Sequence, residues 1–326
     1  MAPKGDVFFC ADLPSKPNPL MGKILVTGAN GYIGGRLVPE LLNRGYDVRI
    51  MVRNKSALYN KKWPDVEVAQ ADALNIDELS SALDGINTAY YLIHSLLLGQ
   101  KTFEKTDLQA ATNFRTAAKK QGIKRIIYLS GLGNRKTSLS PHLDNRIKVA
   151  DCLSEGDVPV TVLRAGMVIG AGSASYTILR NLVDNTPVFF IPKWAKTKSQ
   201  PISVRGVMMY LVGVLENEET TGKRFDIGGP DIVAYDEKLK IMATLLGKKR
   251  YFLPGFFMFS SFYGYVASLL TTVPKPICKI LVEGCKNEVV CQNTEIKKYI
   301  NIKLLPFQSA LIAVLKNENN CEVANY

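Results

Sequence analysis

The chain has 326 residues, 47% of them hydrophobic, and its 41 Lys and Arg against 29 Asp and Glu give a formal net charge of +12. This is a globular composition, long enough for one large domain or for a nucleotide-binding domain with a smaller lobe. The basic residues stand in small separated groups without interleaved aromatic residues, which argues against a nucleic-acid partner. A basic surface still suits an anionic cofactor or an anionic membrane surface.

The ends of the chain and its cysteines suggest a cytoplasmic protein. Residues 1–21 are rich in Pro and polar types, and we expect a flexible leader without the pattern of a secretory signal. The six cysteines form no CxxC pair, so we interpret them as reduced thiols. The spacing of Cys278, Cys285 and Cys291 matches no common zinc pattern, and we expect no metal site.

The run KILVTGANGYIGGRLVPELLNRG reads as a strand at 23–27, a tight glycine turn and a helix that ends at Gly45. In this setting one glycine permits the turn, another lets backbone N–H groups approach a pyrophosphate, and a third lets the helix pack closely on the strand. The pyrophosphate then lies at the helix N-terminus. The residues expected to contact the cofactor here are Thr27, Gly28, Asn30, Gly31, Tyr32, Ile33 and Gly34.

Strands and helices then alternate. The pattern predicts strands at 47–53, 66–72, 88–95, 125–131 and 158–166, with helices at 77–83, 106–121 and 141–153. Near-continuous apolar strands separated by helices predict a parallel sheet covered on both faces, that is, a doubly wound α/β (Rossmann) fold. We expect a cofactor-binding domain at 22–165 and a smaller, mostly helical substrate lobe at 166–326, partly interleaved with the Rossmann sheet.

The end of the second predicted strand points to NADP(H). An acidic residue usually stands there to hold the ribose of NAD, but this chain has Arg53, whose guanidinium can pair with a 2′-phosphate. The alternative is that Arg53 only ends a strand in solvent. Asp72 and Ala73, after the third strand, are candidates for the adenine side of the pocket, and a local turn or helix cap is the alternative for Asp72.

These motifs resemble the extended and atypical short-chain dehydrogenase/reductases, most closely the NmrA-like, epimerase/dehydratase-type NAD(P)-binding proteins. The resemblance covers roughly 22–315 and rests on TGANGYIGG, VRN, YLSGLG, VTVLRAGMVIG, QPISV and FDIGGPDIVAYDE. In that family a Ser near the end of the fifth strand and a Tyr-x-x-x-Lys pair on the next helix carry the reaction. Here Ser130 matches the serine region, but His142-x-x-x-Arg146 stands where Tyr-x-x-x-Lys is expected.

This departure leaves three interpretations of His142. An imidazole with a pKa near ~6.5 can exchange a proton at neutral pH while Arg146 takes over the ribose contacts of the lysine. Alternatively the acid is lost, and the protein binds NADP(H) as a non-catalytic regulator or assembly protein. In the third interpretation His142 only stabilises a helix start, with Ser140 as the cap. Tyr176 is an alternative proton donor.

Two further positions are predicted at the ligand edge of the sheet. His94 closes the fourth predicted strand in LIHS, and Ala165 lies at the end of the sixth. In doubly wound sheets, ligands bind at the carboxyl ends of the strands. We therefore place His94 and Ala165 among the cofactor contacts, with both histidines at one cleft.

The stretch 251–274 is apolar and aromatic without a charged residue. A single membrane span is one interpretation, which Pro254, Gly255 and Gly264 weaken. A lid over a greasy substrate cleft and a patch resting on a membrane are the others. The sequence as a whole favours an NADPH-dependent oxidoreductase acting on a hydrophobic carbonyl or enoyl substrate. The alternative is the non-catalytic NADP(H)-binding protein, with a protein partner.

Overall fold

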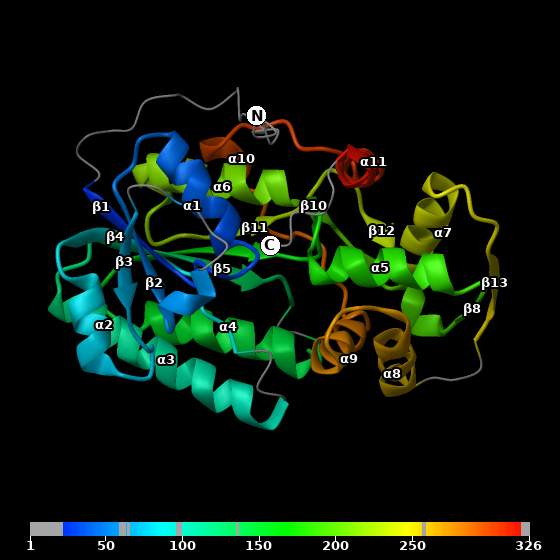
Figure 1. Ribbon diagram of the computed structural model, residues 1–326, viewed down its shortest axis with the longest axis horizontal. Helices are drawn as coiled ribbons and strands as arrows, with labels where there is room; N and C mark the ends of the chain where they lie inside the picture. The colour runs from blue at the N-terminus through cyan, green and yellow to red at the C-terminus, as the bar shows by residue number, and fades with distance from the viewer. Residues whose placement is uncertain are drawn as a thin grey trace.

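The computed structural model describes residues 22–58, 63, 66–95, 100–134, 137–255 and 259–320. The expected leader at 1–21 lies outside the described residues. Two layers of helices enclose a central sheet in one half of the molecule, and a lobe built around α5, α7, α8 and α9 forms the other half (Figure 1). In chain order these four lobe helices are α5 (Ala174–Asn185), α7 (Tyr235–Leu245), α8 (Ser260–Leu270) and α9 (Lys275–Gly284).

Among the described residues, the central sheet contains seven strands in the order β11-β6-β5-β4-β1-β2-β3, and every neighbouring pair is parallel. The strands are β1 (Lys23–Thr27), β2 (Val48–Val52), β3 (Glu67–Gln70), β4 (Ile86–Tyr91), β5 (Arg125–Gly131), β6 (Val160–Ala165) and β11 (Arg224–Ile227). The chain reverses its direction of growth between β1 and β4, which is where a doubly wound sheet binds its ligand. The predicted fold class is confirmed.

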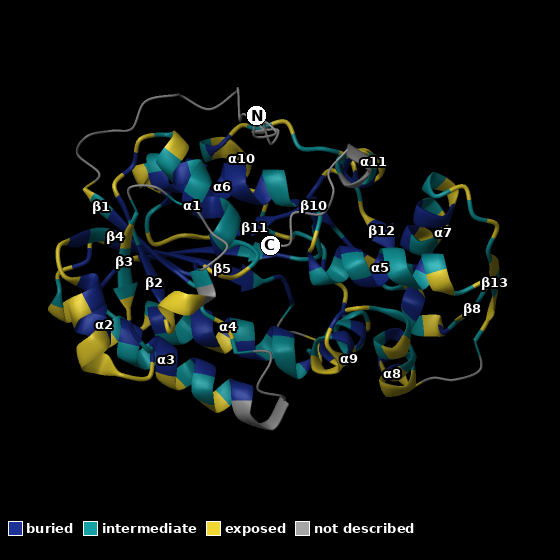
Figure 2. Ribbon diagram, viewed as in Figure 1, coloured by how far each residue is buried: buried dark blue, intermediate teal, exposed yellow. Residues whose placement is uncertain are grey.

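Helices cover both faces of this sheet, as the unbroken apolar strands predict (Figure 2). One face packs against α1 (Gly34–Asn43), α6 (Val204–Glu216) and α10 (Ile296–Tyr299). The other packs against α2 (Ile76–Leu83), α3 (Gln100–Lys120) and α4 (Pro141–Ser154). Because β11, α6 and α10 come from the second half of the sequence, the sheet and its covering layer draw on both halves of the chain.

The fourth predicted strand is too long. The strand β4 ends at Tyr91, and His94 lies three residues later in the connection that follows. The reason lies in the hydrogen bonding, because the backbone N–H of Leu92 donates to the Thr27 hydroxyl at 2.9 Å and so leaves the strand ladder. His94 therefore lies in the connection beyond the carboxyl end of β4 rather than within the strand.

The lobe contains short strand pairs and a second apolar core. Its strands pair as β7 (Val168–Ile169) with β10 (Ile202–Ser203), β9 (Lys198–Ser199) with β12 (Val233–Ala234), and β8 (Val188–Ile191) with β13 (Tyr251–Pro254). Residues of α5, α7 and α11 (Phe307–Asn320) pack together in the core. The remaining short elements are η2 (Lys55–Leu58), η4 (Lys193–Lys196) and η5 (Glu218–Thr220).

The apolar stretch 251–274 is split between β13 and α8. No helix within the described ranges has the length and apolarity required to cross a membrane. The single-span interpretation of this stretch is therefore wrong for the residues described. Pro254 is the last residue of β13, and Gly255 follows it directly.

Candidate cofactor and substrate site

The glycine turn after β1 has the geometry of a pyrophosphate cradle. Gly28 has φ +62°, and a Cβ there would lie 2.6 Å from the carbonyl oxygen of Leu92. A Cβ on Gly34 would overlap the Gly28 carbonyl oxygen and lie 2.9 Å from the Cα of Ala29. These two positions require glycine, one for the turn and one for close helix–strand packing. Asn30 and Gly31 are exposed on the turn, at the N-terminus of α1, so the residues present fit a dinucleotide phosphate.

The neighbours of the turn fix its position. Thr27 is fully buried and donates through its hydroxyl to the Tyr90 carbonyl at 3.0 Å, which ties β1 to β4. Ile33 is the N-cap residue of α1. The guanidinium of Arg36 lies 3.9 Å from the centre of the Tyr32 ring and donates to the Ala171 carbonyl at 2.7 Å. Arg36, which the sequence did not single out, thereby joins the glycine turn to the lobe.

The ends of β2 and β3 lie side by side, because Val52 is the register partner of Gln70. Arg53 is exposed immediately after β2. Asp72 forms a local turn in which its Oδ1 accepts from the Leu74 backbone N–H at 2.9 Å. Ala73 is buried beside it. The arginine and the acid thus stand on neighbouring strand ends, with the Arg53 guanidinium in solvent.

The structure brings the two histidines together. The rings of His94 and His142 stack with their centroids 5.7 Å apart and their planes at 27°. His142 is half-buried, and burial followed by repulsion from Arg146 lowers its pKa to about 3. His94 is exposed, and partial loss of hydration, followed by repulsion from Arg146 and His142, lowers its pKa well below the usual value. Because solvent reaches the His94 ring, its loss of hydration is partial.

This electrostatic environment changes the expected chemistry of His142. An imidazole with a pKa of about 3 is neutral at pH 7, so it carries one N–H donor and one acceptor nitrogen rather than a removable positive charge. Burial and Arg146 thus lower the pKa of His142 below the value near neutrality that the sequence suggests. A neutral histidine can still polarise an oxygen by donating a hydrogen bond, as a neutral imidazole does in triosephosphate isomerase.

The side chains of Ser130 and Arg146 both donate hydrogen bonds to backbone carbonyls across the contact between β5 and α4. The Ser130 hydroxyl is buried and donates to the carbonyl of Arg146 at 3.0 Å, and the Tyr128 hydroxyl donates to the same carbonyl at 3.3 Å. The Arg146 guanidinium donates in turn to the Leu129 carbonyl and lies 5.1 Å from the Tyr128 ring centre. These contacts hold α4 against β5, and they direct the Ser130 proton to the backbone.

A buried acid lies behind this cluster. Asp107 on α3 is 4% exposed and accepts from the Asn145 side chain of α4 at 2.9 Å. Burial raises the pKa of Asp107, while hydrogen bonds and the Arg146 charge oppose that shift. No motif marked Asp107 in the sequence, because it lies on a polar stretch of a long helix and acquires its environment only from packing.

The start of α4 is held by the lobe. Ser140 is the N-cap residue by position, but within the described residues its side chain makes no capping hydrogen bond. The Asn287 side chain instead accepts from the Ser140 backbone N–H at 2.9 Å and donates to the Ser138 carbonyl at 2.7 Å. The expected capping role of the Ser140 side chain is therefore wrong, and Asn287 takes the supporting place.

An apolar cavity of about 490 Å³ joins the Rossmann half to the lobe. Gly131, His142 and Ala165 line it from the carboxyl edge of the sheet. Most of the remaining lining comes from α5, α8 and α9 together with the segment 188–195 of β8 and η4, and Lys238 and Tyr235 of α7 complete the wall. The volume and apolar lining are typical of a site for a small hydrophobic molecule. Tyr176, the alternative proton donor, is 1% exposed in the core of the lobe.

The fold and this edge define an NAD(P)-binding Rossmann-type domain with an attached lobe. Residues 28–187, just under half of the chain, match the protein-family model described as NAD(P)H-binding. The chain is 24% identical over 248 residues to the divinyl chlorophyllide a 8-vinyl-reductase of Arabidopsis thaliana, covering 71% of this chain and 59% of that protein. It is 21% identical over 226 residues to the photosystem II assembly factor Ycf39 of Trieres chinensis, covering 69% of each.

A further relative and two solved structures complete the comparison. A 3 beta-hydroxysteroid dehydrogenase/Delta 5-->4-isomerase of Mycobacterium tuberculosis is 33% identical over 120 residues, 34% of this chain but only 32% of that protein. The NADPH-dependent quinone oxidoreductase QOR2 of Escherichia coli superposes with a TM-score of 0.71 at 20% identity, covering 90% of this chain and 99% of that one. For a nucleoside-diphosphate-sugar epimerase of Staphylococcus aureus the TM-score is 0.69 at 18% identity, with 89% and 99% covered.

Proposed function

We propose that this protein is an NADPH-dependent oxidoreductase that reduces a hydrophobic carbonyl or enoyl compound. The observation that carries the proposal is the apolar cavity of about 490 Å³ that opens onto the sheet edge at Gly131, His142 and Ala165. A nicotinamide held by the glycine turn reaches this edge in doubly wound folds. This supports a site in which an apolar compound would lie beside the expected hydride donor, with the neutral His142 as hydrogen-bond donor to the reacting oxygen.

The test measures NADPH consumption with the purified chain. A panel of hydrophobic aldehydes, ketones, enones and quinones is offered, and absorbance follows the oxidation of the cofactor. His142→Ala should lower kcat/KM for a reduced compound by on the order of 10²–10⁴ while NADPH still binds. If that variant loses thermal stability but keeps its turnover, His142 serves only to stabilise α4.

The preference for NADPH over NADH rests on Arg53. Its exposed guanidinium follows β2 where a carboxylate would serve NAD, and a charged contact to a 2′-phosphate is worth about 1.5–3 kcal/mol. Arg53→Ala should weaken NADPH by on the order of tenfold or more and leave NADH unchanged, as calorimetry can measure. Lys124→Ala is the control, because it removes an exposed cation before β5, at the opposite edge of the sheet. Equal losses in the two variants would leave only a general effect of charge.

A second candidate is a non-catalytic NADP(H)-binding assembly or regulatory protein with a protein partner. Two observations favour it, namely the Ser130 hydroxyl bound to the Arg146 carbonyl and the absence from α4 of the usual tyrosine. The similarity to Ycf39 is consistent with it. Retained nucleotide without turnover of any compound, together with a defined partner in pull-downs, would establish this candidate over the reductase.

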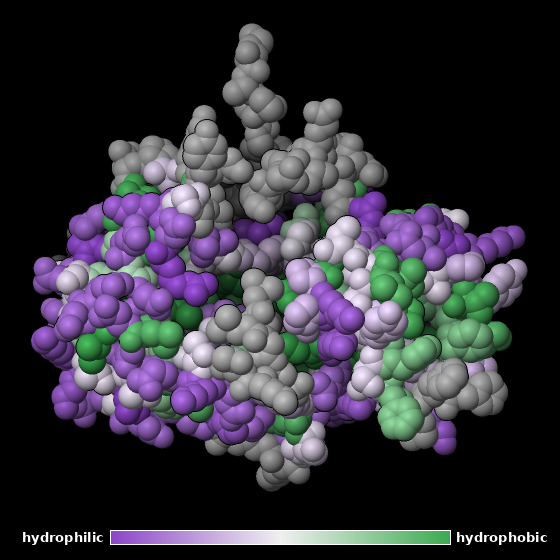
Figure 3. Space-filling model, turned by 60° about the horizontal axis from the view of Figure 1, so that its bottom comes forward, coloured by the Kyte–Doolittle hydropathy of each residue, from purple (hydrophilic) through white to green (hydrophobic). Residues whose placement is uncertain are grey.

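We further propose that the protein works at the cytoplasmic face of an anionic membrane. Large apolar side chains are exposed along β8, β13 and α8, among them Phe190, Tyr251, Phe259 and Leu269 at 52%, 65%, 73% and 66%. Figure 3 shows apolar surface at the lobe end of the molecule, whereas the opposite end is mainly hydrophilic. Exposed lysines at the start of α9 and η4 supply charge that complements anionic lipid.

Vesicle sedimentation tests this contact. Phe259→Glu with Leu269→Glu should abolish binding to vesicles containing phosphatidylserine, because both changes place charge where acyl chains would meet the lobe. Ile232→Glu is the control, since Ile232 is 51% exposed but lies outside β8, β13 and α8. Binding that survives the double change, or that is lost equally in the control, argues against this surface.

A further inference from the structure

A lysine is buried in the wall of the apolar cavity. Lys238 lies on α7, is 1% exposed, and is one of the largest fully buried side chains among the described residues. It lines the cavity together with apolar residues of α5, α8 and α9. Lysine is almost never fully buried without a charged partner, so its place in this lining calls for an explanation.

The contacts of the Lys238 ammonium account for only part of its hydrogen-bonding capacity. It donates to the Ser199 hydroxyl and lies 3.6 Å from the centre of the Tyr235 ring. In the described part of the chain, no carboxylate forms an ion pair with it. Glu237, its neighbour on α7, is exposed and accepts from the Ala234 backbone N–H at 3.0 Å. An ammonium has three N–H donors, so Lys238 can bind a further acceptor.

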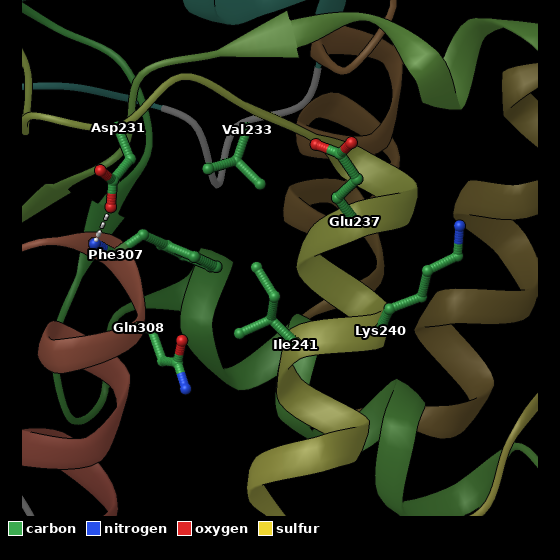
Figure 4. A pocket seen from close by; sticks show the side chains of 7 residues that line it. All are labelled: Asp231, Val233, Glu237, Lys240, Ile241, Phe307 and Gln308. Atoms are coloured by element: carbon green, nitrogen blue, oxygen red, sulfur yellow. Dashed lines mark hydrogen bonds between the residues drawn. The ribbon is translucent and has the colours of Figure 1, made fainter.

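The position of Glu237 explains why it cannot serve as the partner. Glu237 lines a separate pocket of about 410 Å³ on the outer side of α7, together with Lys240 and Asp231 (Figure 4). Lys240 has its own acid, because its Nζ lies 3.2 Å from Asp236. The helix therefore presents one paired lysine to the outside and one lysine to the cavity.

A buried ammonium is unfavourable unless an opposite charge or strong hydrogen bonds compensate for its lost hydration. Burial lowers the pKa of Lys238 to about 8, so the side chain is still largely protonated at pH 7. Tyr235 and Cys285, the other titratable groups beside it, have pKa values raised by burial, and so both are neutral. An anion brought into the cavity by a ligand would supply the missing charge.

We propose that the cavity binds a hydrophobic molecule through a carboxylate that pairs with the ammonium of Lys238. The apolar part of the molecule fills the space between α5, α8 and α9, and the acid end lies at α7. The inference rests on the proposed function in one respect, that the same molecule presents its reducible group to His142. Since His142 comes from α4 and Lys238 from α7, the two groups occupy different walls of one cavity. The substrate class is thus an amphipathic carbonyl or enoyl acid.

The experiment compares two probes of equal chain length, dodecanoate and dodecan-1-ol, on the full chain without cofactor. Calorimetry should give dodecanoate an affinity at least about tenfold above that of the alcohol, because a charge-assisted hydrogen bond is formed in a dry site. Lys238→Met should remove this preference by weakening dodecanoate on the order of 10–100-fold and leaving the alcohol unchanged. Lys240→Met, a change of the same kind on the outer side of α7, should leave both affinities as they are.

Equal binding of the two probes to the unmodified chain would overturn the proposal, and this comparison needs no variant that folds. A preference that persists in Lys238→Met, or that disappears equally in Lys240→Met, would assign it to the general positive charge of the protein. The assay of NADPH oxidation tests the proposed reductase separately from the acid site. If dodecanoate is preferred but no compound oxidises NADPH, the acid site stands alone. If NADPH is oxidised by neutral carbonyls and dodecanoate is not preferred, the reductase stands without the acid site.

Discussion

The glycine turn and the lobe cavity are two halves of one candidate site, and they are built in opposite ways. The turn is a single short segment in which Gly28 and Gly34 are fixed by backbone contacts with near neighbours in the chain and with Leu92. The cavity collects side chains that are far apart in sequence, from His142 to Val289. The turn allows no side chain at these positions, whereas the cavity is defined by which side chains it contains. The first fits a cofactor common to many folds, and in the proposed function the second selects the compound that is reduced.

The largest effect should come from breaking the turn. In Gly34→Val the added side chain would collide with backbone atoms of Gly28 and Ala29, forcing α1 away from β1. We expect a loss of about 1–3 kcal/mol in the free energy of unfolding and at least a tenfold loss of NADPH affinity, as measured by urea titration and calorimetry.

A control separates the two consequences of that change. Gly122 has φ +68° but open space around its Cα, and it precedes β5 at the opposite edge of the sheet. Gly122→Ala should cost about 1 kcal/mol of stability through backbone strain and leave NADPH affinity intact. A normal affinity in Gly34→Val would mean that close packing of α1 on β1 is not what shapes the phosphate site.

The buried lysine of the cavity can be tested through its effect on the free energy of unfolding at different pH values. Because burial lowers the pKa of Lys238 from 10.5 to about 8, the folded state resists protonation there and the unfolded state does not. The contribution of Lys238 to the free energy of unfolding is fully present above pH 10.5, and it is lost as the pH falls from 10.5 to about 8. Lys238→Met should therefore be more stable than the parent at pH 7, by on the order of 1–3 kcal/mol, and this gain should shrink as the pH rises from 8 toward 10.5.

Urea unfolding at pH 7 and pH 9.5 provides the measurement. Lys240→Met should show no such gain, because Lys240 is an exposed side chain paired with Asp236. A Lys238→Met variant less stable than the parent at pH 7 would indicate that the ammonium is already compensated within the fold.

A smaller effect is expected at the contact between the lobe and the start of α4. Asn287 is 7% exposed and makes two hydrogen bonds to the segment that starts α4. Asn287→Ala leaves those backbone groups without partners, and should lower the free energy of unfolding by about 1–3 kcal/mol. Asn185→Ala removes one hydrogen bond to the Leu270 carbonyl at an exposed site, and should change it by less than about 0.5 kcal/mol. Equal effects would show that Asn287 is no more than a surface contact.

The sequence predicted the parallel sheet, its covering helices and the glycine turn because each depends on short-range periodicity or spacing. The bounds of β1 and β5 and the start of α4 were predicted to the residue. The end of β4 was missed because the Thr27 hydroxyl, 65 residues away, takes the N–H of Leu92. Asp107, Lys238 and Asn287 were missed for the same reason, since only packing gives a buried acid, a buried lysine or a helix support its partner.

The last prediction concerns His142, where the cofactor edge and the cavity meet. Burial and Arg146 lower its pKa from 6.5 to about 3, so the folded state excludes a proton that the unfolded state accepts. The stability that this group contributes is complete above pH 6.5 and is lost as the pH falls toward 3. His142→Gln should therefore lose less stability than the parent between pH 7 and pH 4.5, as urea unfolding can show. His94 and Asp107 titrate in the same cluster with lowered and raised pKa values and remain in both proteins, so the difference reports His142 together with its repulsion of His94. The same neutrality predicts that kcat/KM shows no step from His142 between pH 6 and pH 8. An inflection there that disappears in His142→Gln would mean that a bound cofactor restores the pKa of the imidazole, and that proton donation rather than hydrogen bonding is its role.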